Sequence, residues 1–398
     1  MVRQVLMLST SYPLRADSAS GVFVQRLVHA LPEPTTVEVL CPADADALTP
    51  APQGRHRLHA FRYAPRVWRR LAQNPGGVLP AIRRSPVLIA LMPALLLAMG
   101  WNVFRRARNA QLVHANWALC GAIAALALMI RRRPLVVTLR GDDVTLARRS
   151  VLHRMVLSMV IRRAARVVCV ADSMWEQVAR EYPAVQGRLR VVNNGVGDEF
   201  LTLPAPARSV SAAVRLLVIG SLIKRKGIDL LLLALAQSGI SGVEVVIVGD
   251  GPERESLALL SSQLGLHAVI EFAGAQPPHR VPEYLAACDL LVFPSRSEGR
   301  PNVVLEAMAA GRPVVAFAIP GVTDLINSGT EGWLAVPENV TELARALAQA
   351  VCNPKERMLR GEAARRRVLA SRWTWPAAGM AYAAIYDEAM ADVTAYAG

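Results

Sequence analysis

The chain has 398 residues, of which 53% are hydrophobic and 19% are charged, a composition that excludes general disorder. A single hydrophobic core rarely grows past about 300 residues, so the length predicts two domains. Lysine and arginine outnumber the acidic residues by 45 to 31, and the resulting net charge of +14 favours anionic partners such as phosphorylated substrates or acidic lipid.

The cysteines and histidines indicate no disulfide framework and no metal site. The five cysteines stand alone without a CxxC pair, which fits a reduced, cytoplasmic protein. The seven histidines show no HxH or HxxxH spacing, so we expect no bound metal. Residues 2–8 form a short strand-like run rather than a signal peptide.

Strand-like runs alternate with helix-like segments over nearly the whole chain. In the first half we expect strands at residues 4–9, 37–41, 111–115, 135–139, 167–171 and 189–192. In the second half we expect them at 215–220, 243–248, 269–273, 290–293, 313–317 and 333–336. Several are continuous Val, Leu and Ile runs, typical of strands buried on both faces of a parallel sheet. The segments between them are long enough for crossover helices. The pattern predicts an α/β chain of two Rossmann-like, doubly wound parallel-sheet domains.

A segment of linker composition divides this pattern. Residues 201–214 contain Pro204 and Pro206, lack periodicity and follow an Asn-Asn-Gly turn. We therefore expect an N-terminal domain over residues 1–200, a C-terminal domain over 215–375 and an apolar helix over 376–398. Ligands bind beyond the carboxyl ends of the strands in such sheets, so the two domains are expected to face each other across a cleft.

Two apolar runs are candidates for membrane spans. Residues 87–101 and 117–130 are 15 and 14 residues long, short of the ~20 that a span needs, so we expect two buried helices. Six arginines with interleaved Tyr63 and Trp68 occupy residues 62–84, immediately before the first run. Basic residues beside an apolar helix suit an anionic membrane surface. Two interpretations of residues 62–104 therefore remain: peripheral contact with a membrane, or an ordinary basic helix with a buried face.

Residues 294–311 form the most informative stretch, in which a strand runs through a Ser/Gly turn into a helix. Pro301 occupies the expected first helical position, and Gly311 lies just past the end. The free amides near this helix start suit a phosphate. The residues expected to bind it are Gly299, Arg300, Pro301, Asn302 and Val303.

Two glutamates flank this turn. Glu306 lies four residues after Asn302, on the same side of the helix, where its carboxylate can accept from ribose hydroxyls. Glu298 precedes the helix and can reach the group attached to the far phosphate. The pair can bracket a nucleotide sugar, and two solvated glutamates are the alternative.

A second strand–loop–helix unit covers residues 216–227. Its loop carries the consecutive cations Lys224, Arg225 and Lys226. Cations at this place can neutralise the charge that builds on a departing diphosphate, and a solvated basic loop is the alternative.

Together these motifs resemble the retaining glycosyltransferases of family 4, which have the fold called GT-B. Glu298 and Glu306 match the family's Glu-x7-Glu signature, Lys226-Gly227 its Lys-Gly step, and residues 249–252 its Gly-x-Gly-Pro turn. The resemblance spans nearly the whole chain. It implies metal-independent, cofactor-free transfer of a sugar from a UDP- or GDP-sugar to a glycan or lipid-linked acceptor, as in cell-surface polysaccharide synthesis. It also implies that the last helix returns to the N-terminal domain.

The resemblance also assigns roles in the N-terminal half. Gly21 stands where a glycine-rich loop approaches the donor phosphates, residues 114–117 resemble the family's "HahW", and residues 138–143 its "T.rG.D". Catalytic roles are implied for Glu298, Lys226 and His114. Donor binding is implied for Glu306, Gly21, Ser221, Arg225, Arg140 and Gly274, besides residues 299–303.

Two departures from the family pattern keep other functions open. Many members have an arginine where this chain has Ser221, and a histidine where it has Arg140. Arginine cannot act as a base, but it can hold a phosphate bidentately. A nucleotide-sugar epimerase on the same fold and a non-catalytic binder of sugar nucleotides or anionic lipid remain alternatives. A nucleic-acid partner is not expected, because no recognition helix or aromatic–basic array accompanies the charge.

Overall fold

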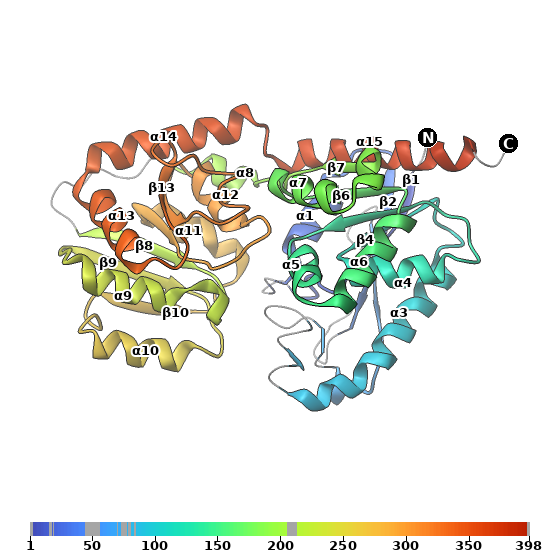
Figure 1. The fold of residues 1–398 in the computed structure, drawn as a ribbon, viewed down its shortest axis with the longest axis horizontal. Coiled ribbons are helices and arrows are strands. Elements are labelled where there is room, and N and C mark those ends of the chain that lie inside the picture. Colours follow the sequence, from blue (N-terminus) through green and yellow to red (C-terminus); the bar gives the residue numbers. More distant parts are fainter. Residues whose placement is uncertain are drawn as a thin grey trace. The chain divides into compact units, whose positions relative to one another are not determined.

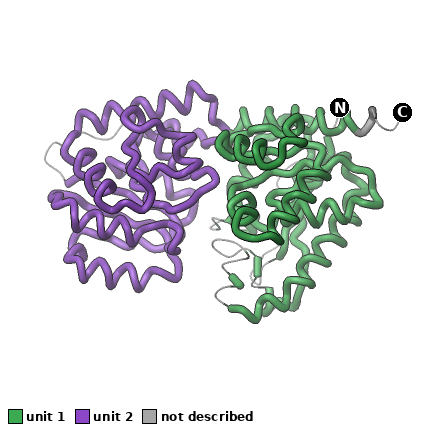
Figure 2. The backbone as a smooth tube through the Cα atoms, viewed as in Figure 1, with its two compact units in different colours: residues 1–194, 375–398 green, residues 195–374 purple. Residues whose placement is uncertain are grey.

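A computed structural model describes residues 3–15, 18, 20–43, 56–69, 71–72, 78, 81–82, 85–204 and 213–395. The chain divides into two compact units (Figure 2). Unit 1 comprises residues 1–194 and 375–398, and unit 2 comprises residues 195–374. Val196 and Phe200 are buried in the core of unit 2, so this unit begins before the linker expected at 201–214. Residues 205–212 of that linker lie outside the described residues.

Unit 1 contains a seven-stranded parallel sheet in the order β3-β2-β1-β4-β5-β6-β7 (Figure 1). Its strands are β1 (Arg3–Leu8), β2 (Thr35–Pro42), β3 (Arg57–Phe61), β4 (Leu112–Asn116), β5 (Leu135–Leu139), β6 (Arg166–Cys169) and β7 (Leu189–Val191). Its helices are α1 (Val22–Ala30), α3 (Met92–Arg106), α4 (Ala118–Ala127), α5 (Asp142–Arg149), α6 (Val151–Arg163), α7 (Asp172–Glu181) and α15 (Trp375–Ala395). Short 3₁₀ turns are η1 (Arg66–Trp68), η2 (Pro86–Leu91) and η3 (Pro183–Arg188).

The central strands of unit 1 bury both faces, since successive side chains point to opposite sides. Leu6 and Leu8 of β1 join a core with α3, α4 and α6, whereas Val5 and Met7 join a second core with α1 and α15. This explains the near-continuous apolar runs of the sequence.

Unit 2 contains a six-stranded parallel sheet in the order β10-β9-β8-β11-β12-β13. Its strands are β8 (Val214–Ile219), β9 (Val243–Val248), β10 (Ile270–Gly274), β11 (Leu290–Phe293), β12 (Val314–Phe317) and β13 (Gly332–Ala335). Its helices are α8 (Asp198–Leu201), α9 (Ile228–Ser238), α10 (Arg254–Gln263), α11 (Val281–Ala287), α12 (Asn302–Ala309), α13 (Val340–Cys352) and α14 (Pro354–Ala370), with the 3₁₀ turns η4 (Lys224–Lys226) and η5 (Pro278–Arg280).

Both sheets confirm the predicted fold class of two doubly wound, all-parallel α/β units. All the predicted strands are present within a few residues, and β3 is an additional edge strand. The strand order reverses between β1 and β4 in unit 1 and between β8 and β11 in unit 2. Crevices at such switch points, outside the carboxyl ends of the strands, are where ligands bind in these folds.

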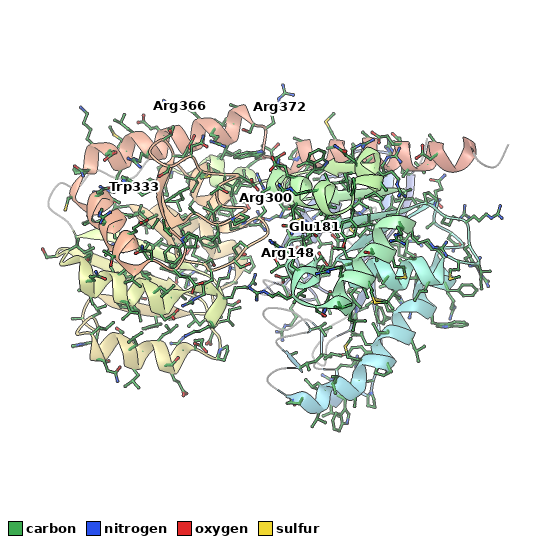
Figure 3. The ribbon with its side chains drawn as sticks, in the orientation of Figure 1. Arg148, Glu181, Arg300, Trp333, Arg366 and Arg372 are labelled. Atoms are coloured by element: carbon green, nitrogen blue, oxygen red, sulfur yellow. The ribbon has the colours of Figure 1, made fainter. Side chains whose placement is uncertain are left out.

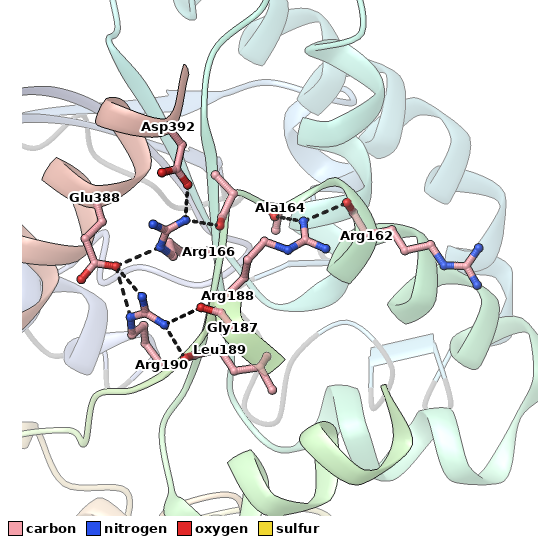
Figure 4. A network of polar contacts seen from close by, with 10 residues as sticks. Arg162, Ala164, Arg166, Gly187, Arg188, Leu189, Arg190, Glu388 and Asp392 are labelled. Carbon is pink, nitrogen blue, oxygen red and sulfur yellow. Dashed lines mark hydrogen bonds and ion pairs between the residues drawn. The ribbon is translucent and has the colours of Figure 1, made fainter. Parts of the chain in front are cut away.

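The last helix, α15, belongs to unit 1 and packs against α1, β4 and β5. Polar contacts fasten its outer side to the sheet (Figure 4). Arg166 of β6 pairs with Glu388 and Asp392, and Arg190 of β7 donates to the same oxygen of Glu388 at 2.8 Å. These ion pairs connect α15 to strands far earlier in the sequence, since Arg166 and Glu388 are 222 positions apart.

The apolar run at 87–101 corrects one expectation. The helical segment Pro86–Arg106 has 21 residues and a mean hydropathy of 2.1, yet only 17% of its most apolar window is buried. Only Leu95, Met99 and Val103 of α3 are buried, so the prediction of a buried helix is wrong. Within the described ranges this is the single helix whose length and composition would allow a membrane span, a criterion that is weak evidence for one helix. The second run, in α4, is mostly buried as expected.

Candidate active site

A buried ion pair stands at the switch point of unit 2. Lys226 ends the turn after β8, and Glu298 lies in the loop between β11 and α12. The Lys226 Nζ atom lies 2.6 Å from Glu298 Oε1, and Ser295 Oγ donates to the same oxygen at 3.0 Å. The side chains of Lys226 and Glu298 are only 18% and 11% exposed. Arg225 approaches the other carboxylate oxygen at 3.9 Å.

The electrostatics of the pair keep Glu298 ionised at neutral pH. Burial by itself would raise the pKa of Glu298, but the charges of Lys226 and Arg225 and the hydrogen bonds from Lys226 and Ser295 outweigh it. The net result is a pKa below the ordinary glutamate value. The site therefore presents a carboxylate and two cations within one small volume.

The two loops that carry the pair are fastened to each other. The guanidinium of Arg296 forms a bidentate contact with Asp229 at 2.9 and 2.8 Å, and its backbone N–H donates to Arg225 O at 2.8 Å. Gly227 has φ +65°, and a Cβ atom there would lie 2.0 Å from Pro294 O. Only glycine fits this approach, which gives the Lys-Gly step a structural reason.

Helix α12 begins at the same edge of the sheet. It starts at Asn302, one residue later than expected, because Pro301 is extended with φ −78° and ψ 110°. The amides of its first turn have no intrahelical acceptor and point toward the switch point. Glu306 lies one turn further along and is partly exposed. Gly311, at φ +68°, ends the helix as the sequence predicts.

The remaining residues predicted to bind the donor in unit 2 lie on the same edge without contacting the ion pair. Ser221 follows β8, and Gly274 ends β10, where its carbonyl accepts from the N–H of Gly249 at 2.8 Å. The side chain of Arg300 is buried, with its guanidinium carbon 4.7 Å from the ring centre of Trp373 (Arg300 is labelled in Figure 3).

His114 is placed differently from our expectation. It lies in β4 with no exposed surface, and its ring nitrogens bond Tyr386 Oη and Thr138 Oγ1, each at 2.8 Å. Burial, with a smaller effect of the Arg140 charge, lowers its pKa to about 3. No ring atom is left to contact a substrate, so the position of His114 does not support the predicted catalytic role; the residue instead anchors α15.

Gly21 and Arg140 lie at the carboxyl edge of the sheet in unit 1. Gly21 precedes α1 at φ +72°, and a Cβ atom there would lie 2.3 Å from Ser11 O, so the loop is tightly packed. Arg140 follows β5, and its guanidinium is held by Asn116 and Asn194. The structure thus gathers the predicted residues into two sets, each at the switch point of its own unit.

Sequence reasoning missed the residues that support the ion pair. Asp229 and Arg296 meet across 67 positions, which no local pattern reveals. Ser295 and Arg296 lie inside the predicted turn. The sequence therefore indicated the loop to which they belong but not the residues that they contact.

A parallel sheet with cations, a carboxylate and a helix start at its switch point is the arrangement of a nucleotide-binding Rossmann-like domain. Two such units in one chain define the GT-B class of fold. The Glycosyltransferase Family 4 description matches residues 20–200, and the Glycosyl transferases group 1 description matches residues 207–367. The chain belongs to these family 4, group 1 glycosyltransferases, and it is an enzyme that uses nucleotide-sugar donors.

Characterised relatives carry out sugar transfers of several kinds. The chain is 28% identical over 299 residues to the alpha-D-kanosaminyltransferase of Streptomyces kanamyceticus, covering 69% of this chain and 77% of the relative. It is 33% identical over 184 residues to the lipopolysaccharide core biosynthesis glycosyltransferase LpsE of Rhizobium meliloti, covering 46% and 51%.

Solved structures share the fold. Sucrose-phosphate synthase from Thermosynechococcus elongatus superposes with a TM-score of 0.81 at 21% identity, covering 98% of this chain and all of that one. The HepE protein of Anabaena in complex with UDP-glucose gives a TM-score of 0.74 at 22% identity, covering 96% and 98%. At these identities the likeness speaks for the fold alone.

Proposed function

We propose that the chain moves a sugar from a UDP- or GDP-sugar to a glycan or lipid-linked acceptor, with retention at the anomeric carbon and without a metal, in cell-surface polysaccharide synthesis. The observation that carries the proposal is the Lys226–Glu298 ion pair at the switch point of unit 2. A buried carboxylate beside two cations supplies both a hydroxyl acceptor and a counter-charge.

Each group has a distinct task in this proposal. Lys226 and Arg225 spread the negative charge that develops on the leaving diphosphate, and the first amides of α12 bind its oxygens. Glu298 orients the sugar by accepting from its hydroxyls, and Glu306 accepts from the ribose. Ser221 and Gly274 contact the donor from the neighbouring loops. Charge spread in this way leaves no step that needs a divalent ion.

The relatives support the choice of donor and pathway. HepE forms a complex with UDP-glucose, the relative from Streptomyces kanamyceticus is an alpha-D-kanosaminyltransferase, and LpsE acts in lipopolysaccharide core biosynthesis. A nucleoside diphosphate sugar as donor and a surface glycan as acceptor agree both with these relatives and with the charged groups of the site.

The test begins with donor binding, followed by transfer. The purified chain is screened against UDP- and GDP-sugars by thermal shift, and the donor that binds is incubated with candidate glycan and lipid-linked acceptors. Proton NMR of the product reports the anomer, and EDTA tests for a metal. We expect retained configuration, EDTA resistance, and turnover lower by on the order of 10² in Glu298→Gln and Lys226→Ala.

Matched controls separate chemistry from folding. Lys355 is an exposed lysine of α14, so Lys355→Ala removes the same charge from the same unit without touching the pair. An acceptor-free incubation that yields an epimerised donor would instead identify an epimerase. Tight donor binding with neither transfer nor slow hydrolysis would identify a non-catalytic binder.

We further propose that unit 1 docks on an anionic membrane at the cytoplasmic face. Helix α3 exposes an apolar stripe, with Leu97 74% and Trp101 59% exposed, that ends at the exposed Arg105. The guanidinium of Arg131 lies 4.4 Å from the ring of Phe104, which joins the basic turn after α4 to the same helix. An apolar stripe bordered by arginines is complementary to acidic headgroups above acyl chains.

Further large apolar side chains are exposed near this stripe. Val87 and Ile89 belong to η2, which contacts α3, and Met129 and Ile130 immediately precede Arg131. Val67 and Trp68 of the basic tract are exposed as well. Arg70, Arg83 and Arg84 of the basic tract lie outside the described residues. The five cysteines are free thiols, which fits the reducing compartment that a cytoplasmic face provides.

A further inference from the structure

Arg140 of unit 1 is a half-buried cation held in a fixed position by neutral groups. Its Nη1 donates to Asn194 Oδ1 at 2.9 Å, and its Nη2 and Nε donate to Asn116 Oδ1 at 2.7 and 3.3 Å. The guanidinium carbon lies 4.6 Å from the ring centre of Phe23. Two amides and one aromatic face therefore set its orientation.

None of these contacts neutralises the charge. Among the described residues, no carboxylate oxygen forms an ion pair with Arg140 within 4.0 Å. The nearby carboxylate of Asp143 accepts instead from the backbone N–H groups of Ala118 at 2.7 Å and of Arg140 itself at 2.9 Å. The Asp143 charge attracts the guanidinium without an ion-pair contact, yet burial outweighs this attraction and lowers the pKa of Arg140. A bound anion would offset this cost of burying the cation.

The guanidinium also keeps hydrogen-bonding capacity. It has five N–H groups, and the three bonds to Asn116 and Asn194 use one on each nitrogen. One N–H therefore remains on each terminal nitrogen. Two such donors on one planar group match the oxygens of a phosphate.

The surrounding loops place this cation where a ligand binds in such sheets. Asn116 ends β4, Arg140 follows β5, and Phe23 lies at the start of α1 beyond β1, so all stand at the carboxyl edge beside the β1–β4 switch point. Trp117 meets the Phe23 ring edge-on, with centroids 5.9 Å apart, and has φ +69°. A bulky residue rarely adopts this backbone conformation, and such outliers concentrate at functional sites.

We propose that Arg140, positioned by Asn116 and Asn194, binds a phosphate ester carried by the acceptor. The ligand class is a phosphate monoester or diester on a sugar or on a lipid, with its neighbouring carbons against Phe23. This inference rests on the proposed function, since it assumes an acceptor in unit 1. It replaces the expectation that Arg140 binds the donor, whose diphosphate is assigned to the cations of unit 2.

The test measures binding of two phosphate probes to the full-length chain by ³¹P NMR line broadening. Glycerol 1-phosphate represents a soluble ester, and farnesyl phosphate in neutral micelles represents a lipid-borne one; glycerol and farnesol are the uncharged counterparts. We expect at least one phosphate probe to bind, and Arg140→Gln to weaken it about tenfold or more, as expected for a lost bidentate charge-assisted contact.

Further variants control for charge and folding. Arg148, an exposed arginine on α5 that is labelled in Figure 3, gives the control Arg148→Gln, which should leave the affinity unchanged. Arg140→Lys keeps the charge and should retain part of the affinity. Thermal unfolding of each variant shows whether unit 1 remains folded. Binding of one probe alone identifies the source of the phosphate as soluble or lipid-borne.

UDP titrated in parallel separates this inference from the proposed function. Unchanged UDP affinity in Arg140→Gln supports an acceptor site, whereas an equal loss of UDP and phosphate binding would return Arg140 to the donor and overturn it. Failure of both phosphate probes to bind the wild-type chain would also overturn it. Arg140-dependent phosphate binding in a chain that binds no sugar nucleotide would refute the proposed function and leave this site standing.

Discussion

Lys226 and Glu298 meet at 2.6 Å across 72 residues of sequence and close an ion pair at the switch point of unit 2. Neither side chain is more than 18% exposed. A donor that binds here must therefore compete with their mutual contact.

The pKa of Glu298 should rise when its partner is removed. Burial acts to raise this pKa, and Lys226 is the largest opposing charge. In Lys226→Ala we expect a higher Glu298 pKa than in the wild type, read from ¹³C NMR titration of glutamate-labelled protein. In the wild type, the stabilisation from the lowered pKa is complete above the ordinary glutamate value and is lost as the pH falls through the Glu298 pKa. The variant lacks the ion pair, so Glu298 takes up its proton at a higher pH. Lys355→Ala should leave the titration unaltered.

The contact between Asp229 and Arg296 should hold in place the two loops that carry Lys226 and Glu298. Both side chains are mostly buried, at 21% and 17% exposure, and the pairing is bidentate. Asp229→Asn should lower the free energy of unfolding by about 1–3 kcal/mol and weaken donor binding. The exposed pair Arg215–Glu244 in the same unit supplies the comparison, since Glu244→Gln should cost less than about 1 kcal/mol. Equal costs in urea titrations would contradict the assignment.

His114 should make the packing of α15 sensitive to acid. Its folded pKa of about 3 lies below the ordinary histidine value of 6.5, so its contribution to stability is complete above pH 6.5 and declines as the pH falls toward 3. The slope is at most about 1.4 kcal/mol per pH unit. Asp143 acts oppositely, because burial raises its pKa to about 6, so stability is gained as the pH falls from 6 to 3.8.

Hydrogen exchange of α15 peptides between pH 7 and 5 measures this balance. We expect protection free energies in His114→Gln to depend less on pH than in the wild type, after correction for intrinsic exchange. Parallel profiles in the two proteins would show that His114 does not couple α15 to pH.

Two glycines in helices should respond oppositely to alanine. A Cβ atom on Gly379 of α15 would lie 2.0 Å from Ala30 O, whereas one on Gly100 of α3 would meet only Ile123 Cγ2 at 3.6 Å. Gly379→Ala should destabilise unit 1 by about 1–3 kcal/mol through overpacking. Gly100→Ala should stabilise it by about 0.5–1 kcal/mol, the ordinary helix preference. Thermal unfolding of both variants tests the packing of α15 on α1.

The apolar stripe of α3 should determine membrane binding. In flotation assays with phosphatidylglycerol-containing vesicles, Leu97→Glu combined with Trp101→Glu should reduce binding about tenfold, because carboxylates then face acidic headgroups. The exposed Leu369 of α14 gives the control Leu369→Glu in the other unit. Wild-type protein that does not float with anionic vesicles, or floats equally with neutral ones, would exclude this docking surface.

Sequence patterns predicted the strands that bury both faces, because continuous Val, Leu and Ile runs between turn residues are typical of a parallel sheet covered by helices. They missed β3, where Phe61 is the only buried residue and Arg57 is exposed. They also wrongly predicted that α3 is buried. An apolar run shows that a segment is hydrophobic, but it does not show how much of the segment other elements cover.

The site was predictable to the level of its loops. Lys226 and Glu298 follow strands that the fold makes neighbours, yet their direct pairing depends on backbone contacts such as Gly227 with Pro294. The sequence pattern places His114 at the end of a strand, where a ligand would bind. Its burial depends in part on Tyr386, which lies 272 residues away and therefore leaves no local signal.

The threading of the chain has a consequence for biosynthesis. Unit 2 is inserted between residues 194 and 375 of unit 1, and Tyr382, Tyr386 and Ala389 complete a core that β1 begins. On the ribosome, β1 therefore emerges well before the α15 residues that cover one face of its sheet. Unit 2, whose residues are contiguous, can finish folding in that interval, so the unit that begins earlier along the chain is completed later.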